Sequence, residues 1–125
     1  MTRWYWQRIG GTLVEEFPAV NCSGTCGQRL IDGIIIKNEQ HIIARPEEIN
    51  LEGKDIIVIQ TKAARLGMYL MGQAFFSASL MESFLPRSIE SVALCLDDDS
   101  VLRPLFENFP NMKVVVYPKG LPLQS

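Results

Sequence analysis

The sequence contains few of the residues on which several common kinds of site depend. Its 125 residues include one histidine, His41, and three cysteines, Cys22, Cys26 and Cys95. Their irregular spacing does not match a zinc site, and an odd, sparse set of cysteines is not a disulfide framework. We therefore interpret the cysteines as free thiols in a reducing compartment and His41 as a hairpin residue, and we expect a cytoplasmic protein.

The chain also lacks an excess of positive charge. Twelve Lys and Arg residues against 14 Asp and Glu residues give a net charge of −2 and a pI of about 5.4. This balance excludes a general nucleic-acid coat, but it allows a local basic groove over an acidic centre. No Walker or dinucleotide-binding glycine motif occurs, and "MTRWYWQRIGG" has neither the apolar core nor the cleavage site of a signal peptide.

Only one stretch, residues 66–85, is long and apolar enough to suggest a membrane span. It carries Gln73, three serines and Glu82 and has no basic flanks, so we expect a buried core helix and no membrane partner. With 47% hydrophobic and 21% charged residues, the chain has an ordinary globular composition. We expect one domain over residues 1–125, with a flexible tail at 118–125.

Apolar runs separated by turn residues predict the order α-β-β-(β)-β-α-β-α-β. The expected helices cover residues 2–9, 62–83 and 97–110, the last capped by Asp99 or Ser100. The expected strands cover residues 12–20, 28–36, 41–44, 55–61, 91–96 and 112–118. The first strands are joined by short turns, as in antiparallel hairpins, and the later strands are joined through helices, as in parallel crossovers. This order predicts an α/β fold with a mixed central sheet flanked by helices.

Two strands carry polar residues among their apolar ones. In "QRLIDGIII", strict alternation puts Asp32 on one face with Leu30, Ile34 and Ile36. In "DIIVIQTK", Gln60 and Lys62 also share a face. If the strands are neighbours, these three polar side chains converge, and they would suit a hard cation beside a positive group. Alternatively, Asp32-Gly33 is a simple bulge or turn and Lys62 extends to solvent from the strand end.

This pattern resembles the PD-(D/E)XK restriction-endonuclease-like superfamily. The matching residues are Asp32, then Gln60-Thr61-Lys62, then Gln73 in the following helix, over roughly residues 13–96. The resemblance implies an α-β-β-β-α-β core, here followed by a C-terminal α-β unit. It also implies a metal-dependent nuclease that acts on DNA with Mg²⁺ or Mn²⁺.

The sequence departs from the family pattern at Gln60, which replaces the usual acid. A glutamine oxygen can ligate magnesium, but it adds no charge. Glu15 or Glu16 could supply the missing carboxylate. Adjacent strand residues face opposite ways and both candidates share a face with apolar residues, so the pattern does not choose between them. We favour Glu16, which is nearer the turn that leads to Asp32.

The resemblance implies a role for each of these residues. Asp32, Gln60 and Glu16 would hold the metal, and Lys62 would orient or deprotonate a water or stabilise the transition state. Gln73 would contact the substrate or support Lys62, or else it fills a polar position on its helix. Arg29 and Arg65 would contact phosphates. The alternative function is a catalytically silent homodimeric interaction or regulatory module of the same fold.

Overall fold

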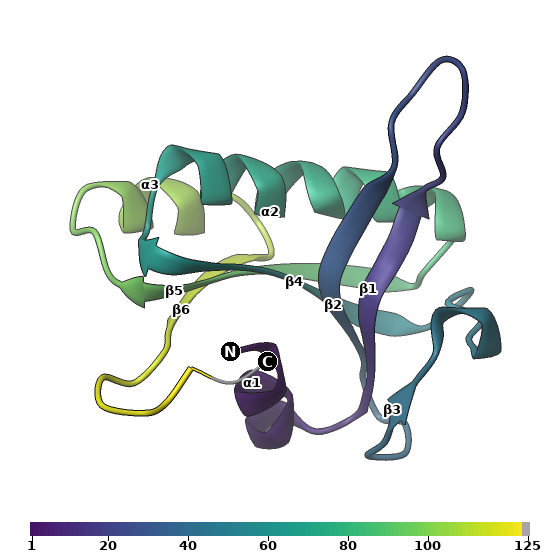
Figure 1. The fold of residues 1–125 in the computed structure, drawn as a ribbon, viewed down its shortest axis with the longest axis horizontal. Helices are drawn as coiled ribbons and strands as arrows, with labels where there is room; N and C mark the ends of the chain where they lie inside the picture. Colours follow the sequence, from purple (N-terminus) through teal and green to yellow (C-terminus); the bar gives the residue numbers. More distant parts are fainter. Residues whose placement is uncertain (124–125) are drawn as a thin grey trace.

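The computed structural model describes residues 1–123 and has an α/β fold (Figure 1). Its elements, in chain order, are α1 (Thr2–Ile9), β1 (Thr12–Val20), β2 (Arg29–Ile36), β3 (Ile43–Ala44), the 3-10 turn η1 (Pro46–Glu48), β4 (Asp55–Arg65), α2 (Met68–Met81), η2 (Glu82–Phe84), β5 (Ser88–Asp97), α3 (Leu102–Glu107) and β6 (Met112–Val116).

The strands form one mixed six-stranded sheet in the order β3-β1-β2-β4-β5-β6. The pairs β1–β2 and β2–β4 are antiparallel, whereas β1–β3, β4–β5 and β5–β6 are parallel. The long connections through α2 and α3 supply the crossovers that parallel neighbours require. The predicted α/β class with a mixed sheet flanked by helices is confirmed.

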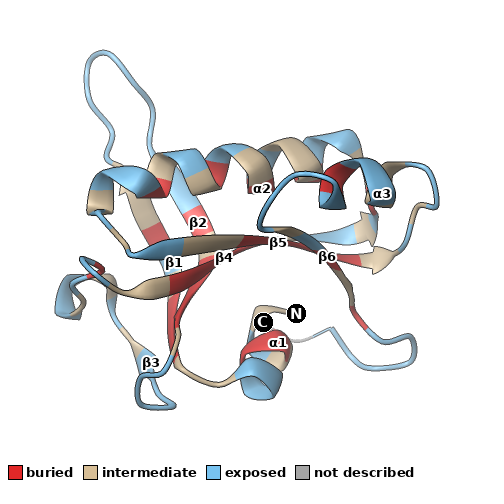
Figure 2. Ribbon diagram, turned by 180° about the vertical axis from the view of Figure 1, so that it is seen from behind, coloured by how far each residue is buried: buried red, intermediate tan, exposed pale blue. Residues whose placement is uncertain are grey.

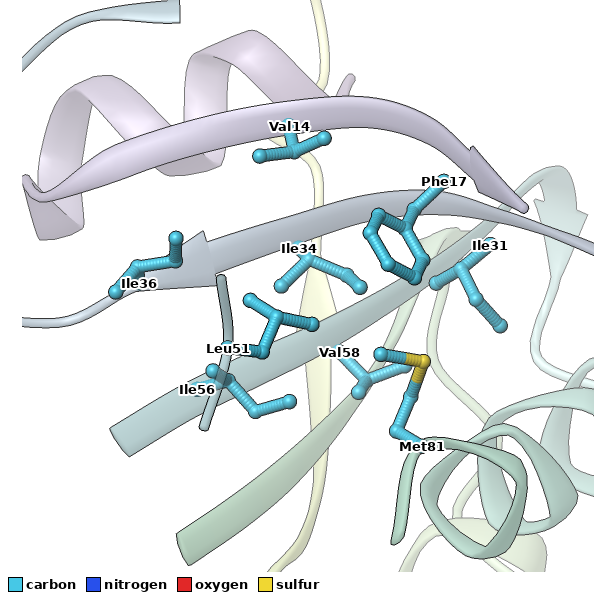
Figure 3. Close-up of a cluster of buried hydrophobic side chains, with 9 residues drawn as sticks. All are labelled: Val14, Phe17, Ile31, Ile34, Ile36, Leu51, Ile56, Val58 and Met81. Carbon is cyan, nitrogen blue, oxygen red and sulfur yellow. The ribbon is translucent and has the colours of Figure 1, made fainter. Parts of the chain in front are cut away.

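Helices cover both faces of this sheet. In Figure 1, α1 lies against one face, and α2 and α3 lie against the other. Beneath α1, Tyr5 and Trp6 pack with Leu13, Ile35 and Ile59. The opposite face has two buried clusters, and most of the sheet interior is red in Figure 2 while the outer surface of α2 is largely exposed. The first of these clusters is shown in Figure 3: Val14, Phe17, Ile31, Ile34, Ile36, Leu51, Ile56, Val58 and Met81.

Two predicted helices have wrong bounds, and the one expected at residues 97–110 covers only Leu102–Glu107. The helix expected from Lys62 begins only at Met68, after Gly67, because β4 continues to Arg65. The neighbouring strand β5 extends to Asp97 and pairs with this continuation, so tertiary pairing overrides the helix propensity of "KAAR". The expected N-cap, Asp99 or Ser100, is displaced, because α3 begins at Leu102 and its N-cap is Val101. Asp99 Oδ1 nevertheless accepts hydrogen bonds from the backbone N–H groups of Val101 and Leu102.

None of the helices within residues 1–123 is long and apolar enough to cross a membrane. Of the tail expected to be flexible, residues 124–125 lie outside the described residues. Before them, the Tyr117 hydroxyl donates a hydrogen bond to the Pro122 carbonyl.

Asp55, at the start of β4, links this strand to the start of β5. Its carboxylate accepts hydrogen bonds from Arg87 and from the Ser88 hydroxyl, and these contacts hold its pKa well below the ordinary value of 3.8. A group whose pKa is lower in the folded state contributes stability above its unfolded pKa and loses it as the pH falls towards the folded value.

We therefore expect the free energy of unfolding to decrease as the pH falls below about 4, and to decrease less steeply in Asp55→Asn. Urea denaturation between pH 2 and pH 5 measures both slopes. Glu52→Gln removes an exposed carboxylate elsewhere and serves as the control. Equal slopes in wild type and Asp55→Asn would contradict the assignment.

Candidate functional site

The strands β2 and β4 diverge part of the way along the sheet, and the predicted site residues lie around this fork. The two strands pair from Ile36–Ile56 as far as Gly33–Ile59. Beyond Gly33, β2 stays with β1, whereas β4 stays with β5 as far as Arg65. Asp32 is the first residue of β2 beyond the last pair and therefore lies where the strands separate.

The Asp32 carboxylate bridges the base of the fork. Its Oδ2 accepts hydrogen bonds from the Thr61 backbone N–H at 2.9 Å and from Thr61 Oγ1 at 3.1 Å. The carboxylate thus takes the place of the β2 carbonyl that would otherwise accept from this N–H group. Asp32 is half-buried, and its other oxygen accepts no hydrogen bond within residues 1–123.

The prediction that Asp32 lies on the same face of the sheet as Ile34 and Ile36 is wrong. Strict alternation would put it with Ile34 and Ile36, but it is Ile31 that packs with them in the cluster of Figure 3. On β1 the same shift occurs, because Val14 and Phe17, three residues apart, both lie in that cluster. The shift coincides with Glu16, whose backbone has a φ of 50° and breaks the alternation of the strand.

A pocket of about 540 Å³, which we call the fork pocket, opens beside Asp32 on the α1 side. It is lined by Met1, Thr2, Arg3, Glu15, Glu16, Asp32, Thr61, Lys62, Ala63 and Leu123. Gly33 lets α1 come this close, because a Cβ there would lie 2.6 Å from Thr2 Cγ2. The fork pocket therefore contains Asp32, both candidate glutamates and Lys62.

The two glutamates differ in what they contact. Glu15 receives two hydrogen bonds from the Arg3 guanidinium, at 2.8 and 3.1 Å, and this contact raises the pKa of Arg3. Glu16 is exposed and has no ion pair among the described residues. Because Glu15 pairs with Gly33 and Phe17 with Ile31, Glu16 lies opposite Asp32 across the two strands. Of the two, Glu16 is the carboxylate free to act with Asp32.

Gln60 lies on the other side of the sheet from the fork pocket. It is 5% exposed, and its Nε2 donates to Ser77 Oγ on α2 at 2.8 Å. The Ser77 hydroxyl in turn donates to the backbone carbonyl of Gln73. The predicted convergence of Gln60 with Asp32 is therefore wrong, because it rested on the alternation that Glu16 breaks.

Gln60 and Gln73 line a second pocket of about 510 Å³, which we call the α2 groove. It lies between α2 and the start of β2 and is lined by Arg29, Leu30, Ile31, Gln60, Met68, Tyr69, Gly72, Gln73, Phe76, Ser77 and Leu80. Of the two arginines expected to contact phosphate, Arg29 lines this groove. Arg65 instead donates to the Asp98 carbonyl at 2.8 Å.

Lys62 connects the two pockets. It lines the fork pocket, yet its Nζ lies 5.6 Å from the centroid of the Tyr69 ring, which borders the α2 groove. The Lys62 ammonium is therefore near the first turn of α2 while its side chain lines the fork pocket, and the face shared with Gln60 stays a prediction. The side chain is exposed, so no uncompensated ammonium is buried.

The carboxylates of the fork pocket suit a metal that needs few protein ligands. Within residues 1–123, no group of three or more His, Cys, Asp or Glu side chains gathers closely enough to enclose an ion. Mg²⁺ needs less than this, because it is commonly bound through one or two carboxylates and keeps several waters. Asp32 and Glu16 supply two such carboxylates in one open pocket.

Sequence reasoning missed the partners that fix these residues. Thr61, the middle residue of "QTK", holds Asp32. Ser77, one of the three serines of the apolar stretch, holds Gln60. Their hydroxyl groups were the available signal, since a hydroxyl next to a buried polar residue in space is a natural hydrogen-bond partner.

Comparisons with protein-family models, with curated proteins and with solved structures find no match to this chain.

The fork gives a direct stability prediction. We expect Asp32→Ala to lower the free energy of unfolding by about 1–3 kcal/mol, because it leaves the Thr61 N–H without its acceptor. Asp32→Asn keeps an acceptor oxygen and should lose less. Urea denaturation at pH 7 measures the differences, with Glu52→Ala as the exposed control. A loss from Asp32→Ala no larger than the control's would show that the fork does not depend on this carboxylate.

Proposed function

We propose that the protein is a Mg²⁺-dependent nuclease that hydrolyses DNA phosphodiester bonds, with a restriction-endonuclease-like fold. The order of β1, β2, β4, α2 and β5 supports this proposal, since it is the order that the sequence resemblance implies. Asp32 on β2, Lys62 on β4 and Gln73 on α2 occupy the corresponding elements.

The observation that carries the proposal is the opposition of Asp32 and Glu16 across β1 and β2. Two like charges directly opposite each other destabilise a sheet. Glu16 in addition has a left-handed backbone, which costs about 1–3 kcal/mol in a residue other than glycine. Arg3, the nearby arginine, already pairs with Glu15, and the lining also contains Lys62 and the amino group of Met1. A divalent cation in the fork pocket would act with these groups to offset the repulsion between the two carboxylates.

The chain's own residues would divide the work around that cation. Asp32 and Glu16 would hold it, Asp32 through the oxygen that Thr61 leaves free. Bound there, Mg²⁺ would neutralise charge on the phosphate and lower the pKa of a water. Lys62, at the rim of the fork pocket, would hold a phosphate oxygen and stabilise charge that develops in the transition state.

This scheme assigns Gln60 a different role from the one its motif implies. The Gln60 amide is held by Ser77 in the α2 groove, so Glu16 takes its place as the second ligand. The expected set of Asp32, Gln60 and Glu16 thus becomes Asp32 and Glu16, which keeps both negative charges and loses one neutral oxygen.

The test is cleavage of single- and double-stranded DNA with Mg²⁺ or Mn²⁺ by wild type and by Glu16→Gln, Asp32→Asn and Lys62→Ala. We expect each substitution to lower the rate at least about a hundredfold, because each removes a ligand or a transition-state contact.

The matched control is Glu15→Gln, which removes the neighbouring carboxylate that Arg3 occupies, together with Glu52→Gln far from the pocket. Both should keep most of the activity. Absence of cleavage by wild type with either ion, or equal activity in Lys62→Ala and wild type, would overturn the proposal.

A further inference from the structure

The α2 groove presents aromatic and apolar side chains to solvent. Tyr69 is 72% exposed, Phe76 65% and Met68 76%, and Leu30 on β2 is also exposed. In Figure 2, α2 carries exposed segments in alternation with intermediate and buried ones. Tyr69 and Phe76 are seven residues apart, two helical turns, and therefore stand on one side of α2 about 10 Å apart along its axis. Exposed apolar surface arranged around a pocket marks a binding site.

The charge around this groove has one sign. Arg29 lines it, and the Lys62 ammonium lies over the Tyr69 ring. No aspartate or glutamate is among the described residues that line it. The chain as a whole has a net charge of −2, so a groove whose one charged lining residue among those described is Arg29, with Lys62 close by, is a local departure from its average. Aromatic rings beside positive charges suit a ligand that combines flat rings with phosphate.

The floor of the groove adds a directed acceptor. The Ser77 hydroxyl donates to the Gln73 carbonyl, so it can only accept from Gln60, which fixes Nε2 of Gln60 towards Ser77. Gln60 Oε1 accepts no hydrogen bond within residues 1–123, and no side-chain N or O atom that is fully buried there lacks a partner, so Oε1 is not fully buried. Because Gln60 lines the groove, this oxygen can accept from an N–H group of a nucleobase bound there.

We propose that the α2 groove holds an unpaired nucleobase of the substrate, stacked on Tyr69 or Phe76, and that the substrate is single-stranded DNA. The proposal rests on the proposed nuclease function and specifies its substrate. Lys62 links the two parts, since it lines the fork pocket and contacts Tyr69. A phosphate at Lys62 would put the adjoining base next to the aromatic side chains of α2. The bases of a duplex are paired and stacked inside the helix and could not enter the groove.

The experiment measures binding without catalysis. Fluorescence anisotropy of a labelled 15-nucleotide oligothymidine and of a 15-base-pair duplex is followed in EDTA for wild type, Tyr69→Leu, Tyr69→Trp and Phe76→Leu. We expect wild type to prefer the single strand. Tyr69→Leu and Phe76→Leu should weaken single-strand binding about five- to a hundredfold, because leucine keeps the apolar surface but cannot stack. Tyr69→Trp should bind within about twofold of wild type.

The control is Leu105→Ser, which changes an exposed apolar residue on α3 and should leave binding unchanged. Equal binding by Tyr69→Leu and wild type, or a preference of wild type for the duplex, would overturn the inference. It would also be overturned if sedimentation showed a dimer that the leucine variants dissociate while DNA binding stays the same, since a second copy would then occupy the groove.

The outcomes separate this inference from the function on which it rests. Metal-dependent cleavage of duplex DNA that Tyr69→Leu does not affect would leave the nuclease in place and remove the single-strand groove. Single-strand binding that depends on Tyr69, without cleavage in Mg²⁺ or Mn²⁺, would support the groove and remove the hydrolysis.

Discussion

The hydrogen bonds from Thr61 to the Asp32 carboxylate are the constraint on which the rest of the site depends. Where the backbone pairing of β2 and β4 ends, the Asp32 carboxylate accepts from the Thr61 N–H in place of a backbone carbonyl. The two strands can therefore separate without leaving this N–H group unpaired. The separation creates room on both sides of the sheet. The fork pocket opens towards α1 and the α2 groove towards the other face. The Asp32 carboxylate thus holds the two strands at the fork with one oxygen, and its other oxygen is available to bind a metal in our proposal.

The two pockets differ in kind, and the difference suggests how they would work together. The fork pocket gathers carboxylates and the end of α1, whereas the α2 groove gathers aromatic rings, Arg29 and the Gln60 amide. Lys62 lines the fork pocket, and its Nζ lies 5.6 Å from the centroid of the Tyr69 ring, which lines the α2 groove. In our proposal a phosphodiester lies at the carboxylates and its neighbouring base lies in the groove. A chain of 125 residues would in this way recognise its substrate with the same elements that hold the metal.

Much of the fold followed from the sequence, because its strands are apolar runs bounded by turn residues, and β1 has the predicted limits Thr12–Val20. The expectation that Asp32, Glu16 and Lys62 lie in one site agrees with the fork pocket, which all three line. The face of the sheet on which Asp32 lies did not follow from the sequence. The left-handed conformation of Glu16 shifts the alternation of β1, and Ile31 replaces Asp32 beside Ile34 in the core. Such a conformation in a glutamate has no signal in the sequence pattern, since glycine or asparagine would be expected there.

The most direct test of the central claim is the position of a bound divalent ion, followed by NMR. Mn²⁺ broadens the backbone amide signals of residues near it, and the titration needs neither substrate nor turnover. The account predicts that the amides of Glu16, Asp32, Gly33 and Thr61 broaden first, and that Glu16→Gln and Asp32→Asn weaken the effect. Broadening centred instead on Asp97–Asp99, or spread evenly over the chain, would show that the fork pocket does not hold the ion.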